Sequence, residues 1–257
     1  MLLAIDMGNT NITLGAFKDD ELLFVSRLYT ARHKSSDEFA IDFLDIFNLY
    51  NVKPTDFSGV IFASVVPELT DPIVRAIKRT VGIEPVIVGG EHNGNLRVDI
   101  LPVSYLGADL IAGAVAAREK YPLPCLVVDL GTATKILVID KDGIFKGCTI
   151  SPGVKISLNA LTQGTALLPS VSLTAPKNAI GENTVECIQS GVVYGTAAMI
   201  DGLIRRIKSE LNEEVAAVIA TGGYSSSIIP SCETEITYDE NLLLDGLREI
   251  YKVVTKM

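Results

Sequence analysis

Two stretches of the chain share one pattern of apolar and polar positions, and each predicts the start of a small sheet. Residues 2–11 and 125–134 both run from a short apolar segment into Asp-x-Gly and then into small hydroxyl or amide residues. Two further β-like segments follow each stretch, at 12–17 and 21–28 in the first half and at 135–139 and 143–150 in the second. The repeat predicts that each half opens as a three-stranded meander.

Helical periodicity follows each meander. Apolar residues recur at i, i+3 and i+4 over 37–49, residues 59–64 form an apolar strand, and a second helix is expected after Pro67. The second half is expected to hold a long helix at 184–211, an apolar strand at 215–220 and a last helix at 242–253. This order predicts an α/β protein with two similar domains, mixed sheets and a cleft between the domains.

A helix predicted at 109–120 links the two halves. The segment Tyr121-Pro122-Leu123-Pro124 breaks that helix directly before the second repeat, because proline interrupts helical hydrogen bonding. We therefore expect an N-terminal domain at 1–118 and a C-terminal domain at 119–257.

Composition and charge narrow the function. The chain has 257 residues, 48% of them hydrophobic, and a net charge of −9, so it has no basic field for nucleic acid. Its apolar runs fall short of the roughly 20 residues that cross a bilayer. The start of the given sequence lacks the pattern of a signal peptide, so we expect no export. We expect a cytoplasmic protein without a membrane span. No zinc site, disulfide framework or histidine triad is expected from the isolated residues Cys125, Cys148, Cys187, Cys232, His33 and His92.

The Asp-x-Gly loops have the chemistry of a phosphate site. Glycine lets backbone N–H groups approach an anion, and an ionised Asp beside a phosphate calls for a cation, for which Mg²⁺ is the best fit. The alternative is that Asp, Asn and Gly serve only as turn residues. Thr221-Gly222-Gly223 follows the strand at 215–220 and suits close approach to adenine, or is a plain connection. The chain has neither a P-loop nor a GxGxxG motif.

Seven short motifs, in this order and at this approximate spacing, resemble the type III pantothenate kinases. They are Asp6-Met7-Gly8-Asn9-Thr10, Leu106-Gly107-Ala108-Asp109, Asp129-Leu130-Gly131-Thr132-Ala133-Thr134, Ser151-Pro152-Gly153, Ile180-Gly181-Glu182-Asn183-Thr184, Gln189-Ser190-Gly191 and Thr221-Gly222-Gly223. The resemblance spans essentially the whole chain. It implies two ribonuclease-H-like domains of the actin, Hsp70 and sugar-kinase superfamily. It also implies transfer of the γ-phosphoryl group of ATP to the 4′-hydroxyl of pantothenate, the first step of coenzyme A synthesis, by a homodimer that uses Mg²⁺ and K⁺ or NH₄⁺.

The resemblance also implies a role for each matching residue. Asp109 would accept the proton, Asp129 would bind the monovalent cation, and Asp6 would hold Mg²⁺ through the phosphates. Pantothenate would be contacted by Gly107, Ala108, Asp109, Leu110, Thr184 and Ile100. ATP would be contacted by Asp6, Met7, Gly8, Asn9, Thr10, Asn11, Ile12, Thr13 and Thr132.

Several of these residues have a second explanation. Asp109 lies at the start of a predicted helix, where Asp often serves as a cap. Thr184 follows Asn183 at the start of another helix, and Glu186 makes a capping-box-like pattern there, so Thr184 has a purely structural explanation too. The small residues within the 184–211 helix indicate packing, either in the core or across a dimer.

Three positions depart from the family pattern. Leu110 and Ile100 stand where these kinases commonly have an Arg and a substrate-contacting Tyr, and Lys135 stands where Thr is common. Lys135 either adds positive charge beside the second loop or projects into solvent. The departures leave an alternative function open, a non-catalytic nucleotide-binding paralogue that acts as a sensor or binds a partner.

Overall fold

A computed structural model describes the chain except for residues 100–101, 165–167, 170 and 257. The described residues form two compact units. The first unit contains Met1–Glu119 together with Leu242–Met257, and the second contains Lys120–Asn241. Short 3-10 helices occur at Pro54–Asp56, Val103–Tyr105 and Ile229–Ser231.

The first unit has a five-stranded mixed sheet in the order β3-β2-β1-β4-β5. β1 pairs antiparallel with β2, and β2 with β3, whereas β1, β4 and β5 run parallel. The strands span Leu2–Met7 (β1), Asn11–Lys18 (β2), Glu21–Tyr29 (β3), Gly59–Ser64 (β4) and Val86–Ile87 (β5), and a further short strand, β6, spans Arg97–Val98. The predicted meander and the apolar strand that follows it are both present.

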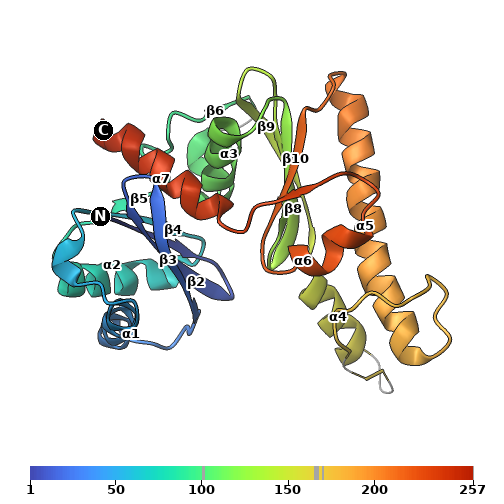
Figure 1. The fold of residues 1–257 in the computed structure, drawn as a ribbon, viewed down its shortest axis with the longest axis horizontal. Coiled ribbons are helices and arrows are strands. Elements are labelled where there is room, and N and C mark those ends of the chain that lie inside the picture. Colours follow the sequence, from blue (N-terminus) through green and yellow to red (C-terminus); the bar gives the residue numbers. More distant parts are fainter. Residues whose placement is uncertain (100–101, 165–167, 170, 257) are drawn as a thin grey trace. The chain divides into compact units, whose positions relative to one another are not determined.

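Helices cover both faces of this sheet (Figure 1). α1 (Ser36–Leu49) and α2 (Pro67–Val81) bury their apolar residues against one face, which includes Leu3, Ile5 and Met7. α1 begins with a capping box, in which the Ser35 N–H donates to Glu38 and the Glu38 N–H donates to the Ser35 hydroxyl. α7 (Leu242–Thr255) packs on β1, β2 and β4, and α3 (Ala108–Lys120) lies against α7 through the close approach of Gly246 to Ala112.

The second unit repeats the topology of the first. Its strands follow the order β11-β10-β7-β8-β9, with β7–β8 and β8–β9 antiparallel and β7, β10 and β11 parallel. The strands span Cys125–Leu130 (β7), Ala133–Ile139 (β8), Ile144–Pro152 (β9), Ala217–Thr221 (β10) and Thr237–Tyr238 (β11). The two Asp-x-Gly motifs therefore occupy the same position in two sheets of the same design.

The described residues of the second unit form the α-helices α4 (Val154–Gln163), α5 (Thr184–Leu211) and α6 (Ser225–Ile228). α5 buries Ile188, Val193 and Ile200 in the core of this unit. Among the described residues α5 is the one helix long and apolar enough to cross a membrane, judged by length and composition alone. Buried core helices share that property, and α5 buries part of its apolar surface in the core of this unit.

The structural division differs in one respect from the two-domain ranges expected from the sequence. The split at Glu119 and Lys120 lies beside the expected boundary at 118, but α7 groups with the first unit and not with 119–257. Leu244 of α7 fills the space over Gly15, and Tyr251 fills the space over Gly59. The apolar side of α7 thus covers a sheet face built from the opposite end of the chain.

Candidate active site

The first Asp-x-Gly hairpin is held by hydrogen bonds from the residue that follows β3. Met7 pairs with Ile12, so that Gly8–Asn11 form the turn, and the Gly8 N–H donates to the Asn11 carbonyl at 2.9 Å. Thr30 donates its backbone N–H to the Thr10 carbonyl at 2.9 Å and its hydroxyl to the Gly8 carbonyl at 2.8 Å. The turn is therefore fixed from one side, which pre-organises it for a ligand.

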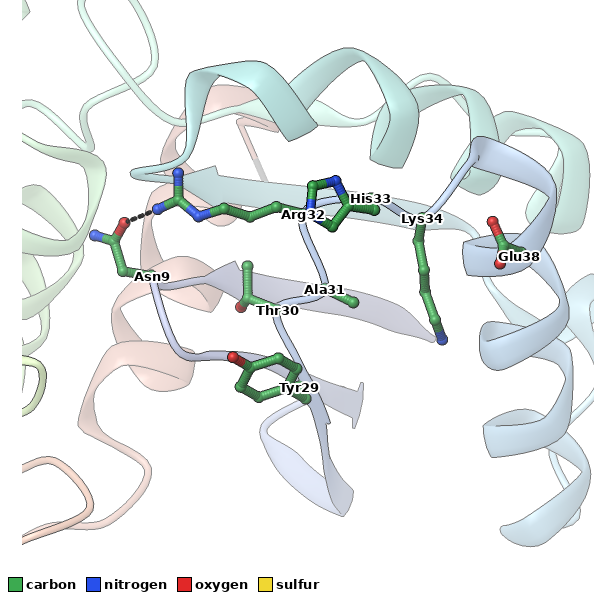
Figure 2. Close-up of a pocket in the computed structure, with 8 residues that line it drawn as sticks. All are labelled: Asn9, Tyr29, Thr30, Ala31, Arg32, His33, Lys34 and Glu38. Carbon is green, nitrogen blue, oxygen red and sulfur yellow. Dashed lines mark hydrogen bonds between the residues drawn. The ribbon is translucent and has the colours of Figure 1, made fainter.

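A pocket of about 400 Å³ opens beside this turn (Figure 2). Arg32 extends across it and donates to the Asn9 side chain at 3.1 Å, and the same guanidinium pairs with Glu68. The pocket is lined by Asn9, Tyr29, Thr30, Ala31, Arg32, His33, Lys34 and Glu38. Cationic side chains therefore lie next to the Gly8–Asn11 turn, which the sequence predicts to bind phosphate.

Asp109 lies in the first turn of α3, at the same sheet edge as this hairpin. Val65, directly after β4, donates its N–H to the Met7 carbonyl at 3.1 Å, and its side chain faces Gly107. A Cβ at Gly107 would lie 2.6 Å from Asp109 Oδ1, so glycine makes room for the carboxylate. Asp109 also accepts the Leu110 N–H at 2.8 Å. The Asp109 carboxylate can therefore cap the start of α3 and still lie at the edge that bears the first hairpin.

Several predicted contact residues point into the protein interior. Met7 and Ile12 are fully buried in the core of the first unit, so they would reach a ligand only through their backbone. Ala108 and Leu110 are buried as well, at 6% and 9% exposure. Leu110 therefore does not present its side chain at the surface where an Arg would. Ile100 lies outside the described residues.

The second hairpin is enclosed by glycines from two other motifs. Leu130 pairs with Thr134, and a Cβ at Gly153 would lie 2.1 Å from the Thr132 carbonyl oxygen. Gly222 has a φ of +95°, and a Cβ there would lie 2.6 Å from the Leu130 carbonyl carbon. The motifs around 131, 153 and 222 meet at one point because only glycine allows such close backbone approach. The side chain of Thr132 stays exposed there.

Asp129 of this hairpin forms an ion pair with Lys135. The two residues are direct cross-strand neighbours in β7 and β8, and Lys135 Nζ lies 2.7 Å from Asp129 Oδ2. Their side chains are 12% and 11% exposed. Of the two explanations left open for Lys135, projection into solvent is therefore wrong.

Thr184 is the first residue of α5. Asn183 caps this helix by accepting the Glu186 N–H at 3.1 Å, while the Glu186 carboxylate accepts the Glu182 N–H at 2.9 Å. The expected cap is present, with the returning bond one residue earlier than in a standard capping box. Thr184 also lines a groove of about 700 Å³ along α5, next to Gly191 and Gly195.

Sequence patterns missed Thr30 and Val65, two of the residues that fix the first hairpin. Thr30 is 3% exposed and follows a strand, and Val65 looks like any apolar residue after a strand. Nothing in their local sequence marks a role, because each acts through a contact with a distant segment. Only the pairing of the strands brings them to the hairpin.

Other reactive groups are few in the part of the chain that the structure describes. No cluster of three or more His, Cys, Asp or Glu side chains that could hold a metal is found among those residues. Burial raises the pKa of the Cys125 thiol to about 12, and burial followed by the Asp201 charge raises that of Cys232 to about 12. These two thiols are protonated at neutral pH and are poor nucleophiles.

The repeated mixed sheets, each opening with an Asp-x-Gly hairpin, define a protein of the actin-like ATPase and sugar-kinase fold. Solved structures share this fold. The activator of 2-hydroxyisocaproyl-CoA dehydratase from Clostridium difficile, with bound ADPNP, matches with a TM-score of 0.61 and 11% identity over 99% of this chain and 96% of that chain. An inorganic polyphosphate/ATP-glucomannokinase from Arthrobacter sp. matches with a TM-score of 0.53 and 13% identity over 100% and 99%.

Sequence comparisons identify the family. The model of the type III pantothenate kinase family matches residues 2–206. A type III pantothenate kinase of Exiguobacterium sp. is 40% identical over 98% of this chain and 98% of its own length, and one of Finegoldia magna is 41% identical over 97% and 96%. The chain belongs to the type III pantothenate kinase family, and it is therefore a kinase.

Proposed function

We propose that this protein transfers the γ-phosphoryl group of ATP to the 4′-hydroxyl of pantothenate, with Asp109 as the proton acceptor. The observation that carries this assignment is the contact series from Met7 through Val65 to Gly107, which brings the Asp109 carboxylate to the edge that bears the first hairpin. A kinase needs a phosphate-binding loop and a carboxylate close to one another. Val65 adjoins both Met7, at the base of the first hairpin, and Gly107, directly before α3.

The first hairpin would bind the ATP phosphates and Mg²⁺. Asp6 is the one partly exposed residue between the buried Ile5 and Met7 of β1, and Mg²⁺ is usually held by one or two carboxylates, waters and phosphate oxygens. Asp6 would supply such a carboxylate, with Mg²⁺ held mainly through the phosphates. The backbone of Gly8, Asn9 and Thr10 would face the phosphates, and the bound metal would neutralise their charge.

Asp109 would orient the attacking hydroxyl and take its proton. As the hydroxyl oxygen bonds to the γ-phosphorus, the bond from that phosphorus to the ADP oxygen breaks, and the hydroxyl proton moves to the carboxylate. ADP leaves with the electron pair of the broken bond. Asp109 is partly exposed, as a group that must meet a substrate has to be.

The remaining site residues would contact the two substrates from their own elements. The exposed side chain of Thr132 would contact ATP at the second hairpin. Gly107–Leu110 would contact pantothenate at the start of α3, and Thr184 would contact it from the groove along α5. Because Leu110 is buried, its contribution would come from the backbone and not from a charged side chain.

We further propose that the protein is a cytoplasmic homodimer. The groove along α5 has small residues at Gly191 and Gly195, and small residues let a second helix come close. Val185, on the first turn of α5, is 41% exposed, so apolar surface at this end of the helix is open to a second copy. Sedimentation equilibrium would test this assembly, with a monomer as the contrary result.

One assay tests the proposed reaction. ADP release from MgATP is measured with and without pantothenate, for the wild type and for Asp109→Asn. We expect pantothenate-dependent turnover that falls on the order of 100- to 10,000-fold in the variant, because a positioned base contributes that much. The amide can still accept the Leu110 N–H, so the helix start should be kept.

Nucleotide binding, measured by calorimetry, is the control for this variant and should be unchanged. A wild type that binds MgATP but shows no stimulation by pantothenate would contradict the proposal and favour a nucleotide-binding sensor. Full activity of the Asp109→Asn variant would remove Asp109 from the mechanism.

A further inference from the structure

Asp129 is the residue at which the family resemblance implies a bound monovalent cation, but a cation of the chain itself is already there. Lys135 Nζ lies 2.7 Å from Asp129 Oδ2, a short and charge-assisted contact. Both side chains are about nine-tenths buried, so water competes little with this pair. The lysine ammonium and a free ammonium ion share one chemistry: a single positive charge with N–H donors and no acceptor.

The backbone of two glycines lies near the other oxygen of the carboxylate. Asp129 Oδ1 lies where Cβ atoms at Gly131 and Gly222 would approach it to 3.2 and 2.8 Å. The Lys135 ammonium contacts one carboxylate oxygen, and the backbone of Gly131 and Gly222 passes near the other. A K⁺ ion at this carboxylate would have to lie next to the ammonium group, and two like charges so close repel each other. The residues present do not fit a separate monovalent cation.

Lys135 differs from a surface lysine. Lys141, two residues beyond the end of the same strand, is 60% exposed and pairs with Asp142 and Glu213 at the surface. Lys135 is instead held inside by its strand position, directly opposite Asp129. Burying an ammonium group is costly unless it is paired, so its position indicates a specific use of the charge.

We propose that Lys135 is a tethered cation that replaces K⁺ or NH₄⁺ at the second hairpin, and that phosphoryl transfer by this protein needs no monovalent cation. This inference rests on the proposed kinase function only where it predicts the rate of phosphoryl transfer. The positive charge remains beside Asp129 at any salt composition, because it is covalently attached. Lys135 would act through the carboxylate and the hairpin as a positioning residue.

The first test compares salts on the wild type. Pantothenate-dependent ADP release is measured in KCl, NH₄Cl, NaCl and choline chloride at one ionic strength. We expect rates that agree within about twofold, since no cation site remains to be filled. Stimulation by K⁺ over choline of about tenfold or more would overturn the proposal.

The second test removes the lysine. Lys135→Thr leaves room and an oxygen ligand for an ion, and we expect its rate in choline chloride to fall by about tenfold or more and to recover in KCl. Lys135→Arg keeps a tethered cation and should stay independent of K⁺. Lys141→Thr removes the same charge from an exposed position and should behave as the wild type. A Lys135→Thr variant as active in choline as in KCl would contradict the proposal.

A binding readout separates this inference from the proposed reaction. The thermal midpoint of each variant is measured with MgADP in KCl and in choline chloride. We expect KCl to raise the midpoint of Lys135→Thr by several degrees and to leave that of the wild type unchanged. If the wild type showed no pantothenate-dependent turnover in any salt, the kinase proposal would fail, and these midpoints would still decide the cation question. A K⁺-dependent midpoint in the wild type would overturn the proposal that Lys135 replaces the monovalent cation.

Discussion

The two Asp-x-Gly hairpins occupy equivalent places in two sheets of the same topology, yet their carboxylates have different neighbours. Asp6 of the first hairpin stands opposite Thr13, whereas Asp129 of the second stands opposite Lys135. Directly opposed residues share one face of an antiparallel pair. A neutral hydroxyl therefore lies beside the first carboxylate and an ammonium beside the second. The same fold motif therefore has two different electrostatic surroundings.

The turns of the hairpins differ by one residue. The first places Gly8–Asn11 between Met7 and Ile12, and the second places only Gly131–Ala133 between Leu130 and Thr134. Because side chains alternate along a strand, the length of the turn decides which residue faces the Asp. The shorter second turn brings Lys135 to Asp129. An Asp-x-Gly motif alone therefore does not determine whether a charged side chain faces its Asp.

The hairpins are also held differently. Thr30 holds the first by two hydrogen bonds to the turn, at 2.8 and 2.9 Å. The second is held by close backbone packing against Gly153 and Gly222, with a hydrogen bond from the Tyr224 N–H to the Leu130 carbonyl at 3.1 Å. The first should therefore respond to loss of a hydrogen bond, and the second to any added side-chain atom.

The largest effect is expected from giving the first hairpin the charge of the second. Thr13→Lys would place an ammonium opposite Asp6, where it competes with Mg²⁺ for the carboxylate. We expect the dissociation constant of MgATP to rise on the order of 100-fold, since like charges at this distance repel by a few kcal/mol. Isothermal titration calorimetry measures this change.

Thr13→Met is the matched control, because it adds a chain of similar length without charge. We expect it to weaken MgATP binding far less than Thr13→Lys does. Equal losses in the two variants would mean that size and not charge matters at Asp6, and the contrast between the hairpins would lose its electrostatic basis.

A stability change of intermediate size is expected at the second hairpin. Gly222→Ala adds a Cβ that would lie 2.6 Å from Leu130 at a φ of +95°, so both overlap and backbone strain oppose it. We expect the free energy of unfolding to fall by about 2–4 kcal/mol. Urea denaturation followed by circular dichroism measures the loss.

The neighbouring residue is a matched control for this variant. A Cβ at Gly223 meets no atom within 4 Å, so Gly223→Ala should change the free energy of unfolding little. If both variants were equally stable, the close packing of the second hairpin against Gly222 would be disproved.

The smallest effect is expected from Thr30→Val. The change removes the hydroxyl that donates to the Gly8 carbonyl and keeps the backbone bond to Thr10. We expect about 1 kcal/mol less stabilisation of the first turn and, as a result, an increase of about fivefold in the KM for ATP. Steady-state kinetics at saturating pantothenate measure the KM for ATP. An unchanged KM would show that this hydrogen bond does not position the turn.

Much of the fold was predictable from local patterns. The repeat of apolar segment and Asp-x-Gly located both hairpins, and the periodicity at 37–49 and 184–211 agrees with α1 and α5. The place of α7 was not predictable, because its apolar side fits either sheet as far as sequence is concerned. Its assignment to the first unit depends on Leu244 and Tyr251 filling space over Gly15 and Gly59.

The site was predictable to a smaller extent. Motifs indicated the hairpin residues, Asp109 and Thr184, but not how they are supported. Thr30 and Val65 act through partners distant in sequence, and the pairing of Lys135 with Asp129 depends on strand register. Register is set by a turn whose length cannot be read from composition, since a slip of one residue reverses every side chain.

The central claim is that the Asp6 hairpin binds the metal-bound phosphates while the Asp129 hairpin keeps a cation of its own. Crystals grown with Mg²⁺ and a non-hydrolysable ATP analogue, then soaked in thallium(I) as a substitute for K⁺, would test it through anomalous scattering. The account predicts the polyphosphate at Gly8–Thr10 and no thallium peak at Asp129. Thallium bound to Asp129 with Lys135 displaced, or the polyphosphate away from the first hairpin, would contradict it.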